Sequence, residues 1–217
     1  CNRGRTPLHY SLESALGLGL VKLLLEACPE AVNRSRCGCT PLVIAIRRNA
    51  PTATIRLLIE ANPNTAALQD SSGHYPLLHA IQYRCSADII EIIANAGGVA
   101  SVTHQDNKGR TALHTAVARS FFGGGRDSWR IVRVLLERAP HIAFTVDRSG
   151  VSPLDLACRH YCRAFQQHCQ IVGDTEIGLV AMTDRVRYAW EMVVLILRAG
   201  RYGRVLDSQS DDGTWRV

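Results

Sequence analysis

Apolar positions recur along this chain in two kinds of segment that alternate as far as about residue 200. In the longer kind, Leu, Ile and Val follow one another at spacings of three and four, which places them on one face of an α-helix. The shorter kind pairs a Leu with an Ala three positions later, and the small Ala lets a neighbouring helix approach. The pattern predicts helices of two alternating kinds. The longer segments are residues 21–27, 55–61, 89–94, 131–137 and 190–197. The Leu–Ala pairs are Leu42 and Ala45, Leu77 and Ala80, Leu113 and Ala116, and Leu154 and Ala157.

A short motif stands at the start of each shorter segment and repeats along the chain. Its glycines are separated by 34, 35, 36 and 41 residues and are Gly4, Gly38, Gly73, Gly109 and Gly150. Residues 38–42, which read GCTPL, are typical of the motif. A period of about 35 residues indicates a repeat architecture, in which one repeat cannot bury its own apolar face and must pack against the next.

Each repeat has the residues that begin and end two helices. An Asp three positions before the glycine can accept backbone amides of the turn, as expected for Asp70, Asp106 and Asp147. A Thr or Ser then caps a helix whose first turn accepts Pro. Tyr75 replaces this cap in the third repeat and predicts a weaker helix start. The second helix ends at Ala-x-Pro, Ala-Pro or Ala96-Gly97, where a helix cannot continue.

The pattern D-x-x-G-x-T-P-L-H-x-A followed by V-x-x-L-L resembles the ankyrin repeat family over about residues 1–200. Ser35 replaces the turn Asp of the family, and Val43, Leu78 and Asp155 replace its His. The resemblance implies an all-α solenoid of about five helix-turn-helix repeats with short hairpin-like turns, in which His9 and His114 brace the turns. We expect repeats near residues 1–34, 35–69, 70–105, 106–146 and 147–200.

The fourth and fifth repeats carry insertions after their first helix. Gly123-Gly124-Gly125 lacks the Lys-Ser/Thr of a phosphate-binding loop and is interpreted as a turn. Residues 163–183 lengthen the first helix of the fifth repeat and break at Gly173-Asp174, and they form either a partner-specific finger or a tolerated loop. A new helix is expected near Thr183-Asp184, and its inner face is predicted to carry Val186, Trp190, Val193 and Leu197. Residues 201–217 are expected to form either a degenerate sixth repeat or a tail.

Composition places few further limits on the chain. Its 217 residues begin with Cys1 instead of Met, so we expect an excerpt or a processed form of a longer chain. No secretory leader and no transmembrane segment is recognisable. The eight cysteines are therefore expected to be reduced thiols in a cytoplasmic or nuclear protein.

Candidate chemistry for catalysis or metal binding is weak in this sequence. No nucleophile, zinc-protease or paired-carboxylate motif is found, so we expect neither an enzyme nor a cofactor. Cys158, His160, Cys162, His168 and Cys169 could in principle complete a zinc site. Because Cys158, Cys162, Phe165 and Cys169 share one helical face, a buried apolar stripe is the preferred interpretation, and no metal site is predicted there or at Cys37-x-Cys39.

Positive charge concentrates where the resemblance implies the concave side of the stack. The net charge is +6, and all 25 basic residues except Lys22 and Lys108 are Arg, which a GC-rich genome could also explain. The positions at turn tips and first-helix ends are enriched about threefold in basic residues relative to the whole chain. The predicted partner-binding residues are Arg3, Arg5, Arg36, Arg47, Arg48, His74, Gln82, Tyr83, Lys108, Arg110, Arg119, Arg148 and Arg159.

A non-catalytic protein-interaction scaffold is the favoured function. A groove lined by one sign of charge attracts the opposite sign, so the expected partner is an acidic or phosphorylated protein segment. The alternative is binding of nucleic acid or anionic lipid headgroups by the same arginines, which is second because Tyr83 is the only aromatic residue in the set. Acidic side chains interleaved with these arginines in the folded structure would refute the basic groove.

Overall fold

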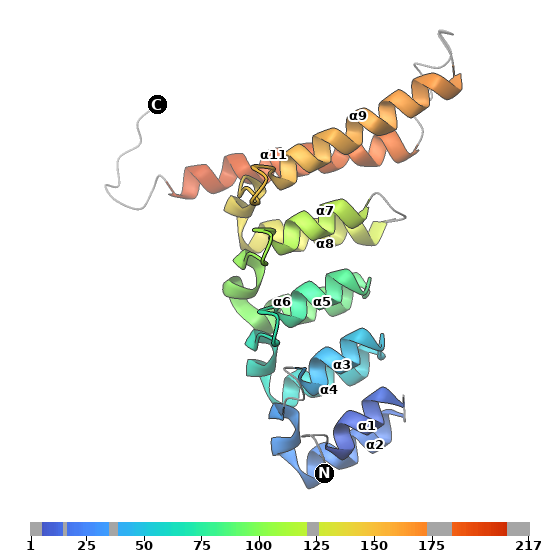
Figure 1. Ribbon diagram of the computed structural model, residues 1–217, viewed down its shortest axis with the longest axis vertical. Helices are drawn as coiled ribbons and strands as arrows, with labels where there is room; N and C mark the ends of the chain where they lie inside the picture. The colour runs from blue at the N-terminus through green and yellow to red at the C-terminus, as the bar shows by residue number, and fades with distance from the viewer. Residues whose placement is uncertain (1–5, 15–16, 35–38, 121–125, 173–183, 208–217) are drawn as a thin grey trace. The chain divides into compact units, whose positions relative to one another are not determined.

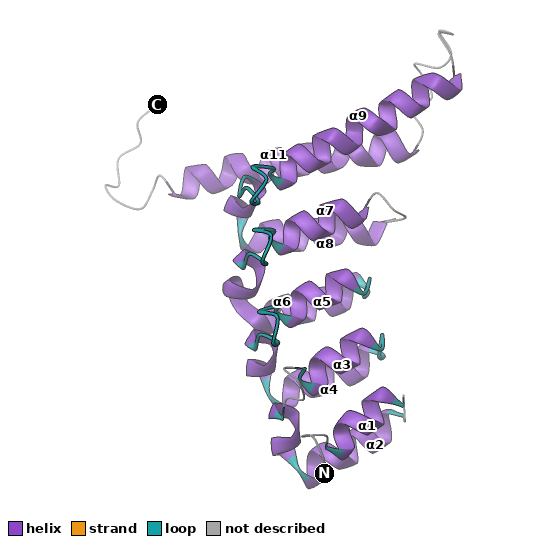
Figure 2. Ribbon diagram, in the orientation of Figure 1, coloured by secondary structure: helices purple, strands orange, loops and turns teal. Residues whose placement is uncertain are grey.

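The computed structural model describes residues 6–14, 17–34, 39–120, 126–172 and 184–207 (Figure 1). Regular structure within these residues is helical, as Figure 2 shows, and the predicted all-α fold is confirmed. The chain divides into two compact units, Cys1–Asp106 and Asn107–Val217, named here the N-terminal unit and the C-terminal unit.

Helix pairs followed by a short 3-10 turn or a break make up the N-terminal unit. Its first helices contact one another in the order α1, α3, α5, and its second helices in the order α2, α4, α6, as the repeat predicts. The elements are α1 (Pro7–Glu13), α2 (Leu18–Ala27), η1 (Pro29–Asn33), α3 (Pro41–Arg47), α4 (Thr52–Ala61), η2 (Pro63–Ala67), α5 (Pro76–Gln82) and α6 (Ala87–Thr103).

The C-terminal unit is built in the same way, with a longer last pair. Its elements are α7 (Ala112–Ser120), α8 (Arg126–Arg138), η3 (Pro140–Ala143), α9 (Pro153–Val172) and α11 (Asp184–Asp207). Helix α7 packs on α9 and α8 packs on α11. Helices α9 and α11 run along each other and extend beyond the shorter α7 and α8 (Figure 1). No helix among the described residues is long and apolar enough to cross a lipid bilayer.

The insertion of the fifth repeat is helical up to Val172, so the predicted lengthening of the first helix is confirmed. The next helix begins at Asp184, as expected, and runs past residue 200 to Asp207. Gly123-Gly124-Gly125, the break at 173–183 and the segment 208–217 lie outside the described residues.

Helix starts follow the predicted capping. The Val43 amide donates to Oγ1 of Thr40 at 3.4 Å, and Pro41 occupies the first helical position, where no amide is needed. Tyr75 makes no side-chain cap, as expected, and its ring instead lies edge-on to His104 with centres 5.0 Å apart. Helix α5 therefore starts without the hydrogen bond that Thr40 supplies at the start of α3.

The histidine that the resemblance implies as a brace performs that role in α7. The Thr111 amide donates to Nδ1 of His114 at 3.1 Å, while Nε2 of His114 lies 3.0 Å from the Val151 carbonyl oxygen. In α9, the first helix of the next repeat, Asp155 replaces this His. The amide and hydroxyl of Ser152 donate to the Asp155 carboxylate at 2.9 and 2.7 Å. The Asp155 amide donates back to the Ser152 hydroxyl at 3.1 Å, so the substitution preserves a reciprocal cap.

Aspartates close the turns between repeats. The Asp147 carboxylate accepts the amides of Ser149 and Val151 at 2.8 and 3.1 Å, and Asp70 makes the equivalent bonds at 2.8 and 2.9 Å. Gly150 supplies the positive φ of +74° that the turn requires. These bonds confirm the predicted role for Asp70 and Asp147.

The predicted apolar stripes form the core. Ile55 and Leu58 of α4 are fully buried, and the Leu–Ala pairs of the first helices are buried except for Leu154, which is half-buried. Helix α6 breaks at Gly98, where φ is +66°, one residue after the predicted end at Ala96-Gly97. The stripe of α4 is covered by α2 and α6 of the adjacent repeats.

The predicted buried stripe on α9 is wrong. Cys158 and Cys162 of α9 are exposed, and Phe165 is 41% exposed, because α9 turns Ala157 and Ala164 toward its neighbours instead.

On α11, Val186 and Val193 are buried as predicted, but Trp190 and Leu197 are 49% and 41% exposed. The buried positions include Ala189, Met192 and Ile196. A Cβ at Gly200 would overlap the ring of Phe144. Gly200 therefore lies on the face of α11 that packs against Phe144. Trp190 lies beside Tyr161 of α9, with ring centres 5.4 Å apart.

We predict that Gly109→Ala lowers the free energy of unfolding of the C-terminal unit more than Gly150→Ala does. The two glycines have nearly equal φ angles, +76° and +74°, so both variants bear the cost of left-handed backbone, about 1–2 kcal/mol. A methyl group at 109 would also lie 2.8 Å from the Arg148 backbone nitrogen, which donates to the Lys108 carbonyl at 3.0 Å, whereas at 150 it would meet nothing within 4 Å. Urea unfolding followed by circular dichroism measures both, and equal losses would contradict the turn-to-turn contact.

Acid should destabilise the C-terminal unit through its turn carboxylates. The pKa values of Asp147 and Asp155 lie below the ordinary 3.8 because the backbone amides of Val151 and Ser152 donate to them. Such groups stabilise the fold above their unfolded pKa, and this contribution is lost as the pH falls through the folded pKa. We expect the Tm of the wild type to fall as the pH drops below about 4, and that of Asp147→Asn/Asp155→Asn to fall less. Identical pH dependence of the two proteins would contradict this account.

Candidate functional site

The predicted partner-binding residues that the structure describes all lie at the surface. Six are exposed: Arg47, Arg48, Tyr83, Lys108, Arg148 and Arg159. Four are half-buried: His74, Gln82, Arg110 and Arg119. Arg3, Arg5 and Arg36 lie outside the described residues.

In the N-terminal unit the structure brings Arg47 and Tyr83 together at the ends of α3 and α5. The guanidinium carbon of Arg47 lies 5.8 Å from the centre of the Tyr83 ring, within the range of a cation–π contact. The hydrogen bond from Arg47 to the Tyr83 side chain raises the pKa of Arg47, and the guanidinium also donates to Sγ of Cys39 at 3.7 Å. Tyr83 remains 43% exposed, so the pair offers an ordered cation beside an accessible aromatic ring.

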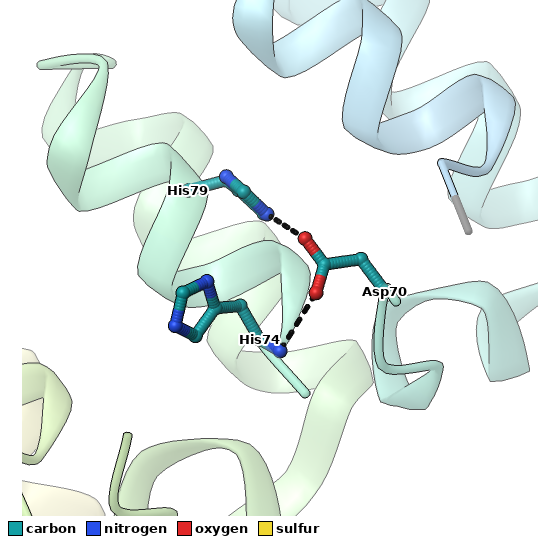
Figure 3. Close-up of side chains that lie close together, drawn as sticks. All are labelled: Asp70, His74 and His79. Atoms are coloured by element: carbon teal, nitrogen blue, oxygen red, sulfur yellow. Dashed lines mark hydrogen bonds and ion pairs between the residues drawn. The ribbon is translucent and has the colours of Figure 1, made fainter. Parts of the chain in front are cut away.

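A cluster of Asp70, His74 and His79 continues from this pair (Figure 3). The His79 ring centre is 6.3 Å from that of Tyr83 and 5.8 Å from that of His74. Nε2 of the buried His79 lies 2.8 Å from Oδ2 of Asp70. Burial raises the pKa of Asp70, but hydrogen bonds from the His74 amide, the His79 ring and the Ser72 amide outweigh it, so that pKa is lowered.

The sequence pattern indicated His74 as a site residue but not its two partners, Asp70 and His79. Asp70 was assigned only to the turn, and His79 stands one position after the place where the ankyrin resemblance implies a His. The spacing Asp-x3-His-x4-His over ten residues was the available signal. It is easily overlooked because the three residues lie in one turn and at the start of one helix and show no pairing between distant segments.

The charge pattern of the C-terminal unit differs from the predicted single sign. Arg110 lies close enough to Asp147 to contribute to its lowered pKa, and Arg159 acts in the same way on Asp155, four positions earlier on α9. Acidic side chains are therefore interleaved with these two arginines. Their carboxylates offset part of the positive charge of Arg110 and Arg159.

The segment considered for zinc is not assembled into a site by the described residues. Cys158 and Cys162 are exposed and His160 is half-buried on α9. The side chains of His168 and Cys169, like Cys37, lie outside the part of the chain that the structure describes.

Comparison with known proteins agrees with the helix pairs, the caps and the turns. A family model described as ankyrin repeats (3 copies) matches residues 14–106 and 47–139, which together are more than half of the chain. Rabankyrin-5 of Mus musculus is 32% identical over 156 residues, which are 71% of this chain and 12% of that protein. The B-cell lymphoma 3 protein homolog of Mus musculus is 30% identical over 119 residues, which are 54% of this chain and 26% of that protein.

The chain thus spans only a small part of either relative. Ankyrin repeats generally serve as protein–protein interaction modules, and the described surface offers residues suited to such contacts. The family match, the repeated helix pairs and the reciprocal caps lead to the same assignment. This chain belongs to the ankyrin repeat family.

Proposed function

We propose that this chain is a non-catalytic interaction scaffold that binds an acidic or phosphorylated protein segment. The observation that carries the proposal is the stacking of Arg47 on Tyr83, at the adjacent ends of α3 and α5. A guanidinium forms two parallel hydrogen bonds to a carboxylate or phosphate, which a Lys ammonium cannot do.

The contacts of Arg47 favour recognition of an anion by this residue. Its side chain is held by the Tyr83 ring and by Cys39, so part of the entropy that a long side chain loses on binding is already lost. Arg48 follows on the same helix end and is exposed, which adds a second positive charge. The exposed ring of Tyr83 supplies apolar contact area beside the charge, a combination that is enriched at protein interfaces.

The remaining predicted residues extend this proposed surface without being central to it. His74 and Gln82 lie in the same unit, while Lys108, Arg110, Arg119, Arg148 and Arg159 belong to the C-terminal unit. Because Asp147 and Asp155 accompany Arg110 and Arg159, we assign the strongest attraction for anions to the Arg47–Arg48 end. We further propose that the protein acts inside the cell, in the cytoplasm or nucleus.

Charge reversal tests the proposal in a pull-down from nuclease-treated cell extract at two salt concentrations. We predict that Arg47→Glu/Arg48→Glu loses an acidic protein that the wild type retains, by roughly tenfold or more in affinity. Arg34→Glu/Arg56→Glu is the matched control, because it makes the same charge change at two exposed residues outside the first-helix ends. Loss of the partner in both variants would point to net charge instead of this site.

Arg47→Lys separates the two kinds of anionic partner. It keeps the charge but removes the planar fork and the stacking on Tyr83, so binding of a carboxylate or phosphate segment should weaken. A polyanion held by charge alone would tolerate this change and would bind with a steep dependence on salt. Retention of all partners by the charge-reversal variant would refute the proposed surface.

A further inference from the structure

Three metal-ligating side chains meet in the N-terminal unit around the start of α5. Asp70 lies in the preceding turn, His74 lies just before the helix and His79 lies on it (Figure 3). Each offers one ligand atom, and the three atoms lie within 4.8 Å of one another. The two imidazole rings face each other edge-on, at an interplanar angle of 75°.

The fold orients the carboxylate of Asp70 through its hydrogen bonds. Oδ1 accepts the amides of Ser72 and His74 at 2.8 and 2.9 Å, and Oδ2 lies 2.8 Å from Nε2 of His79. The side chains of Asp70 and His79 are only 7% and 11% exposed. Hydrogen bonds of this kind to the second oxygen of a carboxylate orient it for metal binding.

A structural brace explains part of this arrangement but not all of it. The bond between Asp70 and His79 ties the turn to α5 and does not require His74. The ring of His74 nevertheless lies beside the pair, with its centre 5.8 Å from that of His79. We propose that Asp70, His74 and His79 together bind a divalent transition-metal ion, for which Zn²⁺ is the probe.

The distances suit such an ion after a small adjustment. Zinc binds His nitrogen and carboxylate oxygen at about 2.0–2.2 Å, which places neighbouring ligand atoms about 3.3 Å apart in a tetrahedron. Asp70 and His79 are already closer than this, and the ion would replace the proton that they share. His74 is half-buried and would need to move its ring by roughly 1.5 Å, which side-chain rotation can supply.

The donor set also suits a transition metal. Two imidazoles and one carboxylate favour zinc and its neighbours over Mg²⁺ or Ca²⁺, which prefer oxygen ligands. Three protein ligands leave a fourth position for water, on the side of the half-buried His74. The site stands independently of the proposed scaffold function, because it needs no partner to form.

His74→Gln is the decisive variant, since the hydrogen bond from His74 to Asp70 comes from the His74 backbone amide, which the substitution keeps. We predict that calorimetric titration of the metal-free full chain with Zn²⁺ detects a site that His74→Gln weakens by roughly tenfold or more. His141→Gln, at an exposed His in the C-terminal unit, is the matched control and should bind as the wild type does.

Because the eight cysteines compete for zinc, nitrogen NMR of labelled histidines locates the binding. Zn²⁺ should shift the ring-nitrogen signals of His74 and His79 in the wild type, and in His74→Gln the His79 signal should shift only at higher Zn²⁺ concentration. Equal affinity of His74→Gln and the wild type, or unshifted His74 and His79 signals, would show that Asp70 and His79 form a structural brace alone.

Discussion

The structure depends on one constraint: a helix pair of about thirty residues cannot bury its own apolar face, so it must be covered by the next pair. The stripe of Ile55 and Leu58 on α4 is fully buried because α2 and α6 pack on either side of it. Small residues such as Ala45 and Ala80 let the first helices approach. Caps and turn carboxylates then satisfy the backbone groups that the helix ends leave unpaired.

Because the apolar stripes and the caps stabilise the fold, the residues at the turn tips and the first-helix ends can vary without destabilising the core. Arg47 and Tyr83 meet there because α3 and α5 are neighbours in the stack, although the residues lie far apart in sequence. The Asp70–His79 pair both stabilises the helix stack and lies next to a residue of the proposed partner-binding surface. Its hydrogen bond joins turn to helix, while the neighbouring His74 remains half-buried.

Local features were predictable because they depend on nearby residues. The cap at Thr40 and the amides accepted by Asp147 involve residues within four positions, and the structure has both. The inner face of α11 was predicted only in part, since Val186 and Val193 are buried but Trp190 is exposed. Helical periodicity indicates which residues share a face, but two overlapping faces of α11 are both apolar. The choice between them was made by the close contact at Gly200 with Phe144.

The sequence by itself determined the repeat, the helix starts and ends, the turn bonds and most of the core, because these follow from short-range hydrogen bonding and from periodicity. Only the tertiary structure decided which charged residues have partners. Arg47 was recognisable as a surface residue, but its stacking on Tyr83 requires the register between two helices. The proximity of Arg110 to Asp147 likewise arises between turns of successive repeats. Such contacts depend on how neighbouring repeats align in three dimensions, which no local pattern of residues specifies.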